Sequence, residues 1–165
     1  MVHITIRKLM YINPRTAIAE GWVTLPYWMD DKQREKCVQP NALDFTVDQI
    51  SKIIQTPCYI GEDAKLMRQQ SVCIPTIVDT HESVAHWELD VGSYDFMSNF
   101  YVDLPEGVAA IVATRSTFIR NGLFVTTGLW DSGFKGPAGG VLHNPVAHAR
   151  IAEHVRIAQL IFVQT

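Results

Sequence analysis

The stretch that decides the fold reads Ala113-Thr-Arg-Ser-Thr-Phe-Ile-Arg-Asn-Gly122 and resumes, after a short spacer, as Trp130-Asp-Ser-Gly-Phe-Lys-Gly136. An apolar run, Val108-Ala-Ala-Ile-Val112, leads into it and is typical of a buried strand. A further apolar run, Arg156-Ile-Ala-Gln-Leu-Ile-Phe162, follows near the end of the chain. An Arg-Ser pair follows the strand, and a carboxylate beside aromatic residues follows the spacer. These segments therefore predict parts of one anion-binding site.

Working outward, short apolar runs separated by turn residues recur through the second half of the chain. The expected strands are 87–91, 100–104, 108–112, 123–127 and 155–163, with breaks at Gly92, Ser98-Asn99 and 105–107 and a glycine-rich hairpin over 133–140. Short strands at this spacing favour a sandwich or barrel-like β fold. The organisation predicted is a single mainly-β domain over residues 1–165.

The first half of the chain gives weaker signals. Residues 2–12 predict a short strand or extended arm, 30–36 a solvated loop or helical turn, and 63–70 one helical turn. Leu43 to Val47 alternates apolar with polar residues like a half-buried strand, which puts Asp44 on the face opposite Leu43 and Phe45. An unpaired carboxylate is costly to bury, so on this pattern alone we expect Asp44 to be exposed at an edge.

Composition narrows the class of protein. Hydrophobic residues make up 47% and charged residues 19% of the 165-residue chain, as in ordinary soluble globular proteins. A formal charge of −3 offers no basic face for nucleic acid. No secretory signal or membrane-length apolar run is visible, and three cysteines without metal spacing favour reduced thiols, so we expect a cytoplasmic protein without nucleic-acid or membrane partners.

The polar residues of the deciding stretch each have two interpretations. Arg115, Ser116 and Arg120 can converge on phosphate oxygens, because guanidinium groups donate paired, charge-assisted hydrogen bonds; the alternative is a surface strand end. Asp131 can act on a water as a general base, or can simply be a turn aspartate.

Two polar residues of the last apolar run also leave alternatives open. Gln159 is a lone amide in an apolar segment, so it serves either a site or a cross-strand hydrogen bond. Arg156 is either a strand-end cation or a phosphate ligand.

Several other kinds of site are excluded by their missing motifs. His86-Trp-Glu88 matches half of the zinc deaminase signature, but no Pro-Cys-x-x-Cys follows it. The chain also has no His-Glu-x-x-His, no phosphate-binding P-loop and no Gly-x-Ser-x-Gly. Metalloprotease, P-loop and hydrolase-elbow mechanisms therefore have no support.

Taken in order, four segments resemble the dUTPase and dCTP deaminase superfamily across roughly residues 38 to 163, closer in sequence to the dCTP deaminase-like branch. They are Gln39-Pro-Asn-Ala-Leu-Asp44, Arg115-Ser-Thr-Phe-Ile-Arg-Asn-Gly122, Trp130-Asp-Ser-Gly-Phe-Lys-Gly136 and Arg156-Ile-Ala-Gln-Leu-Ile-Phe162. The resemblance implies a distorted β-barrel or jelly-roll subunit, a homotrimer with sites at subunit interfaces, and Mg²⁺ carried by a pyrimidine deoxynucleoside triphosphate.

The resemblance also implies roles on the phosphate side of the site. Arg115, Ser116 and Arg120 match the positions of phosphate ligands, and Arg156 is grouped with them as substrate-binding. Asp44 matches the first-motif aspartate near the metal-bound phosphates, with any metal contact passing through water.

On the sugar side, the resemblance implies that Asp131 contacts the sugar and helps to orient the attacking water. Phe134 matches an aromatic residue that packs on deoxyribose, and Trp130 is its neighbour in the substrate-binding group. Gln159 matches a residue that supports phosphate and water positioning.

The choice of reaction depends on Val141. In deaminases of this superfamily, the strand after the Asp-x-Gly-Phe/Trp-x-Gly segment carries a glutamate that activates water, and that glutamate aligns with Val141 through Gly136 and Asn144. Valine cannot act as a general base. Hydrolysis of dUTP to dUMP and pyrophosphate needs no such glutamate and is therefore favoured; the alternatives are dCTP deamination and a non-catalytic nucleotide-binding or regulatory homologue.

Two departures from the superfamily pattern add expectations. The printed sequence ends at Thr165 without the glycine-rich arm that usually closes over the triphosphate, so we expect another segment to substitute or activity to be low. Pro137-Ala-Gly-Gly140 occupies an expected strand, so that edge should be bent. The sequence leaves open the choice among uracil, cytosine and a modified pyrimidine.

Overall fold

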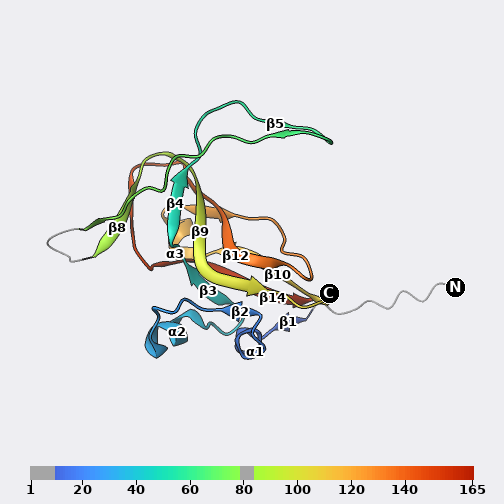
Figure 1. Ribbon diagram of the computed structural model, residues 1–165. Coiled ribbons are helices and arrows are strands. Elements are labelled where there is room, and N and C mark those ends of the chain that lie inside the picture. The colour runs from blue at the N-terminus through green and yellow to red at the C-terminus, as the bar shows by residue number, and fades with distance from the viewer. Residues whose placement is uncertain (1–9, 79–83) are drawn as a thin grey trace.

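The computed structural model describes residues 10–78 and 84–165, and two large antiparallel sheets dominate it (Figure 1). In the first sheet, β14 pairs with β10 along one edge and with β3 and β1 along the other. Its strands are β1 (Tyr11–Ile12), β3 (Leu43–Thr46), β10 (Val108–Thr114) and β14 (Arg156–Gln164).

In the second large sheet, β9 pairs with β12 on one side and with β2 and β4 on the other, and β11 lies beyond β12. Its strands are β2 (Val23–Thr24), β4 (Gln49–Lys52), β9 (Gly92–Asp103), β11 (Phe124–Thr126) and β12 (Lys135–Asn144). Along β9 every second side chain is buried from Tyr94 to Val102, the period expected of a strand with one face on the core.

The core lies between these two sheets. The Phe45 ring of the first sheet packs against Phe96 and Phe100 of the second, with ring centroids 6.2 and 6.4 Å apart. Buried apolar residues from Ala17 to Phe162 belong to the same cluster. In the described residues the two sheets remain separate, so the mainly-β prediction is confirmed whereas the closed barrel is not found. The single domain over residues 1–165 stays a prediction.

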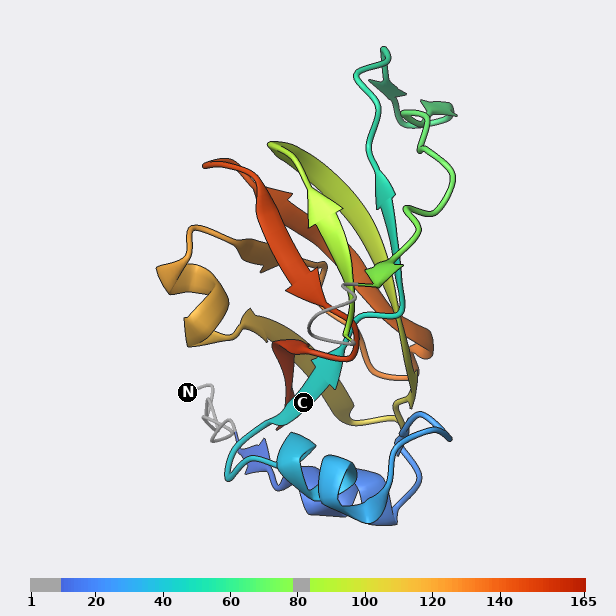
Figure 2. The ribbon, with the colours of Figure 1, turned by 90° about the vertical axis from the view of Figure 1, so that its left-hand side faces the viewer.

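Two smaller sheets and three short helices complete the described structure. The smaller sheets combine β7 (Ile77–Val78), β8 (Ala85–Leu89) and β13 (Ala149–Ala152), and β5 (Tyr59–Ile60) with β6 (Lys65–Leu66). The helices are α1 (Pro14–Ala19), α2 (Asp31–Cys37) and α3 (Ser116–Arg120). The β5–β6 arm (residues 59–66) projects from the end of the molecule opposite to α1 and α2 (Figures 1 and 2).

The charge run over residues 30–36 forms a helix because its ends are capped. Asp30 and Gln33 make a reciprocal capping box, and basic residues in the last turn favour the helix dipole. The helical-turn alternative stated for this run is therefore confirmed. None of the helices in the described part of the chain combines the length and the apolar character needed to cross a bilayer.

Several local predictions were wrong. Residues 63–70 contain β6 instead of a helical turn, and β9 runs unbroken through Ser98, whose hydroxyl accepts a hydrogen bond from the Phe100 amide. Residues 133–140 are not a hairpin, because β12 begins at Lys135 and passes through Pro137. The bend expected there is confirmed, since the β9–β12 register shifts between Pro137 and Gly139. The expectation for residues 2–9 lies outside the described residues.

Candidate functional site

Asp44 is the centre of a buried polar cluster at one end of the first sheet. Its side chain has 0% exposure, which overturns the expectation of an exposed edge residue. All four residues of β3 are buried, because β14 pairs with this strand while the second sheet packs on Phe45. Period-two alternation therefore does not describe β3, and the carboxylate depends on partners from other elements.

Three side chains from two other elements supply those partners. Arg115 Nε lies 3.0 Å and Arg156 Nη1 3.2 Å from one carboxylate oxygen, and Gln159 Nε2 donates to the other at 2.8 Å. Gln159 stands directly opposite Asp44 in the β3–β14 register, so the pairing of the strands creates this contact. The cross-strand hydrogen bond stated as one alternative for Gln159 is confirmed, and its role in a site stays a prediction.

The cluster is also tied to the backbone. Arg115 Nη1 donates to the Arg156 carbonyl oxygen at 3.0 Å, and Arg156 Nη1 donates to the Lys36 carbonyl at the end of α2. Burial raises the pKa of Asp44, while the hydrogen bond from Gln159 and the charges of Arg115 and Arg156 act in the opposite direction. Two guanidinium groups are thus held in fixed orientations, each side chain about a quarter exposed at 24% and 28%.

Helix α3 continues this cationic end of the sheet. It begins directly after Arg115, whose backbone is its N-cap, and it carries the exposed residues Ser116 and Arg120 in its first and last turns. The chain reverses after α3 at Gly122, which has a φ of 74° that favours glycine. The three residues predicted to meet phosphate therefore come from one strand-to-helix junction.

Asp131 and its aromatic neighbours form a second, separate group. Trp130 is buried and bridges to Ala110 of β10, and the Phe134 ring stacks on Trp130 with centroids 5.3 Å apart. Asp131 is exposed, and within the described residues its carboxylate has no hydrogen bond or ion pair. Its backbone carbonyl accepts from the Phe134 amide at 3.0 Å, which closes the turn.

The two groups lie at different levels along β10. Trp130 bridges to Ala110, whereas Arg115 follows the last residue of the strand, so five positions separate the two levels, or about 17 Å at strand spacing. Within one chain the predicted phosphate ligands and the predicted sugar-side residues therefore do not converge. One group presents cations and a hydroxyl, and the other presents a free carboxylate beside an aromatic pair.

Cys37 packs beside the Asp44 cluster and was given no role by its sequence context. It is the last residue of α2 and is buried, and burial raises the pKa of its thiol to about 11. A single cysteine at the end of a charged segment forms no sequence pattern, so its burial beside Asp44 could not be predicted. The Lys36 carbonyl, which Arg156 contacts, was likewise missed because backbone acceptors leave no trace in side-chain patterns.

We expect native protein at pH 8 to expose two of its three thiols to a thiol-reactive dye. Cys58 and Cys73 are exposed, whereas Cys37 is buried and stays a neutral thiol well below pH 11. Titration with a disulfide dye should give about two equivalents in buffer and the third only in urea. A third equivalent that reacts at the same rate in buffer would contradict the packing of α2 on β3.

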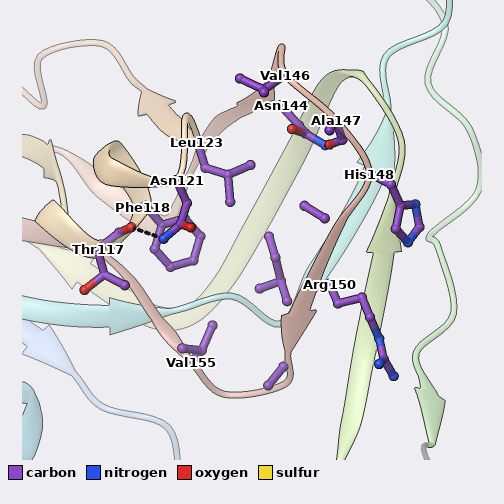
Figure 3. Close-up of a pocket in the computed structure, with 13 residues that line it drawn as sticks. Thr117, Phe118, Asn121, Leu123, Asn144, Val146, Ala147, His148, Arg150 and Val155 are labelled. Carbon is purple, nitrogen blue, oxygen red and sulfur yellow. Dashed lines mark hydrogen bonds between the residues drawn. The ribbon is translucent and has the colours of Figure 1, made fainter.

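A pocket of about 380 Å³ lies on the other side of α3 (Figure 3). Thr117 and Phe118 of α3 and Asn121, which follows the helix, form one wall, and His148 and Arg150 lie on the far side. The Asn121 amide donates to the Thr117 carbonyl at 2.8 Å. None of the residues predicted to bind substrate lines this pocket, so it is not the place where those residues converge.

A solved structure with a similar arrangement of strands defines the fold class. The dCTP deaminase from Agrobacterium tumefaciens has a TM-score of 0.70 over 96% of this chain, at 15% sequence identity. The match spans 48% of that protein, so this chain corresponds to about half of its length. The chain therefore shares the fold of that protein.

Family and relatives follow from sequence comparison. Residues 27–165 match the model of the dCTP deaminase-like family, and the chain belongs to that family. A probable deoxyuridine 5'-triphosphate nucleotidohydrolase of Methanococcoides burtonii is 32% identical over 95% of this chain and 84% of its own length. A protein of the same name from Methanosarcina mazei is 29% identical over 95% of this chain and 83% of its own length.

Proposed function

We propose that this protein hydrolyses dUTP to dUMP and pyrophosphate. The observation that carries the proposal is the likeness, over 95% of this chain, to the two relatives named as probable deoxyuridine 5'-triphosphate nucleotidohydrolases. The geometry is suited to the reaction, because a cationic strand-to-helix junction and a free carboxylate are both present. Such preorganised charges stabilise the negative charge that develops during attack on phosphorus.

In this proposal the cationic junction receives the triphosphate. Arg115 and Arg156 are oriented by Asp44, and Ser116 and Arg120 extend the donors along α3. Gln159 is held by the same carboxylate at 2.8 Å, so it supports this end of the site. Asp44 itself acts as a positioning residue, because its side chain has 0% exposure and no surface for a ligand.

Asp131 is assigned to the water that attacks. The water oxygen bonds to the α-phosphorus, the bond from the α-phosphorus to the bridging oxygen breaks, and pyrophosphate leaves with that oxygen. Asp131 orients the water and accepts its proton, which its unpaired and exposed carboxylate can do. Phe134, stacked on Trp130, supplies a flat apolar surface for the deoxyribose.

Magnesium is proposed to arrive on the triphosphate. Mg²⁺ is usually held by one or two carboxylates together with substrate phosphates, and it neutralises phosphate charge when bound. The carboxylate of Asp131 has no partner within the described residues and can therefore contact the ion, whereas both oxygens of Asp44 already accept hydrogen bonds from protein groups.

A homotrimer with sites at subunit interfaces is proposed for the assembly. The support is the separation of about 17 Å between the level of Asp131 and that of Arg115 along β10. In this proposal a complete site takes Asp131 from one copy and the cationic junction from another.

Deamination of dCTP is the second candidate. The family match and the Agrobacterium tumefaciens structure favour it. Against it stands Val141, a half-buried valine of β12 without an ionisable group at the position where the superfamily's deaminases carry their base.

One assay separates the candidates. Purified protein is incubated with Mg²⁺ and either dUTP or dCTP, and pyrophosphate and ammonia are both measured. We expect pyrophosphate from dUTP and no ammonia from dCTP. Ammonia from dCTP without pyrophosphate from dUTP would establish the deaminase, and tight binding of dUTP without either product would establish the non-catalytic homologue; each of these results would overturn the proposed hydrolysis.

A further inference from the structure

The pocket on the other side of α3 (Figure 3) contains none of the residues assigned to hydrolysis, and we refer to it as the α3 pocket. Its lining includes the buried apolar side chains of Phe118, Leu123 and Ile151, together with Val146 and Val155. Pockets for small molecules usually measure about 300–1,000 Å³, and this one measures about 380 Å³. The space therefore suits a compact molecule of one or two rings.

Asn144 is the buried polar residue of this lining. It is the last residue of β12 and is 2% exposed. Its amide nitrogen donates to the backbone carbonyls of Leu89 and Asp90, each at 3.0 Å, and of Ala147 at 2.6 Å. These three acceptors occupy both N–H groups and fix the plane of the amide. Within the described residues the amide oxygen of Asn144 accepts no hydrogen bond.

The unpaired oxygen of Asn144 is still reachable by a small molecule. In the described part of the chain, the fully enclosed side-chain N or O atom without a partner is Trp28 Nε1, so Asn144 Oδ1 is not sealed from solvent. Because Asn144 is otherwise buried and lines the α3 pocket, its access comes from that pocket. Buried amide oxygens normally receive a donor. The pocket therefore contains a fixed acceptor that a ligand can satisfy.

The charged groups at the rim of the α3 pocket do not favour an anion. His148 Nδ1 lies 3.3 Å from an Asp90 carboxylate oxygen, and its Nε2 lies 3.9 Å from one of Glu88. Arg150 Nε lies 3.7 Å from the other Glu88 oxygen. Each basic side chain thus has a carboxylate beside it, and an anionic ligand would be repelled by Glu88 and Asp90. A neutral ligand fits this rim better than a phosphate does.

We propose that the α3 pocket binds a compact neutral molecule that has an apolar body and one N–H or O–H donor, which hydrogen-bonds to Asn144 Oδ1. The apolar lining covers the body, and the amide oxygen selects for the donor. A molecule of the same shape without the donor leaves that oxygen unpaired and therefore binds more weakly. Ser116 and Arg120 of α3 do not line the pocket, and the proposal does not depend on phosphate hydrolysis.

Indole and benzofuran are a matched pair of probes, because they share one shape and differ in a ring N–H against a ring oxygen. Methyl NMR of the full chain gives a local readout: Leu123 and Val155 line the pocket, whereas Leu43 of β3 does not. We expect indole to shift the methyl signals of Leu123 and Val155 and to leave those of Leu43 unchanged. Benzofuran should need a concentration roughly tenfold higher or more for half-saturation. No shift at the solubility limit of indole, or equal half-saturation by both probes, overturns the proposal.

Thr117→Trp tests the place of binding, with Ile119→Trp as the matched control. Both residues are exposed on α3, but Thr117 lines the pocket and Ile119 does not, so both variants should stay folded, which a thermal scan checks. The new side chain at position 117 fills the pocket and should abolish the shifts caused by indole, whereas Ile119→Trp should retain them. Shifts in Thr117→Trp equal to those of the unmodified protein overturn the proposal. Because the probes carry no phosphate, its failure leaves the dUTP assay unaffected.

Discussion

Asp131→Asn should lower the turnover number for dUTP by about two to four orders of magnitude, the usual contribution of a positioned general base. Asparagine keeps the shape of the side chain but cannot accept the proton of the attacking water. Because Asp131 is exposed and unpaired in the described residues, its replacement should leave the thermal midpoint within about 1 °C. The measurements are steady-state pyrophosphate release and a thermal scan.

A neighbouring carboxylate provides the control for that loss of charge. Glu106 is exposed and lies beside the same turn, 3.4 Å from the Ser132 hydroxyl, so Glu106→Gln removes one charge without removing the proposed base. It should retain activity within about twofold. Undiminished turnover in Asp131→Asn, or an equal loss in Glu106→Gln, would remove Asp131 from its assigned role.

Mixed assemblies test whether sites are shared between copies. Arg120 is exposed at the end of α3, so Arg120→Ala should impair triphosphate binding without unfolding the chain. When Asp131→Asn and Arg120→Ala chains are unfolded and refolded together, some interfaces should combine the intact Arg120 of one chain with the intact Asp131 of the other. Activity should then exceed the sum of the two separate variants, whereas a site contained in one chain would show no recovery.

Asp44→Ala should destabilise the folded protein by about 3–5 kcal/mol, the range for removing one partner of a buried ion pair. The substitution leaves Arg115, Arg156 and the Gln159 amide without their shared acceptor and opens a cavity beneath β14. Urea denaturation followed by fluorescence gives the free energy of unfolding. Asp48→Asn is the control, because Asp48 lies just beyond β3 and has no side-chain partner among the described residues; it should change stability by less than about 0.5 kcal/mol.

Asp44→Asn separates charge from shape at the same position. Since burial raises the pKa of Asp44 above 3.8, the folded state binds this proton more tightly than the unfolded state. The stabilising contribution of the protonated carboxyl is therefore present in full below about pH 3.8 and is lost as the pH rises through the raised value, whereas the ion pairs with Arg115 and Arg156 require the ionised carboxylate. Asp44→Asn should cost less than Asp44→Ala and should remove this pH dependence, and a variant with unchanged pH dependence would contradict the assignment.

Local pattern was sufficient where one chemical preference acts alone. The strands around Val108 and Ile157 were predictable, because apolar β-branched runs between turn residues have few other structures open to them. For the run that forms the helix over residues 31–37, the sequence left a loop and a helical turn open. The capping box that favours the helix depends on a reciprocal contact between Asp30 and Gln33. The run at 63–70 was misassigned because its charged residues suit a helical turn as well as an arm.

The surroundings of Asp44 show why site geometry escaped prediction. The alternating pattern of β3 predicted the strand correctly but predicted an exposed Asp44 side chain, which is wrong. The second face of the strand is buried by α2 and by side chains more than a hundred residues away along the chain.

By itself, the sequence determined the mainly-β class, the family through four ordered motifs, and the residue types available for phosphate chemistry. Those properties follow from local propensity and from the identity of side chains. Only the tertiary structure decided that Asp44 holds Arg115, Arg156 and Gln159, and that Trp130, the neighbour of Asp131, bridges to β10 about five strand positions from Arg115. The physical reason is that burial and distance are set by which strands pair and in which register, and these depend on contacts between segments far apart in the chain.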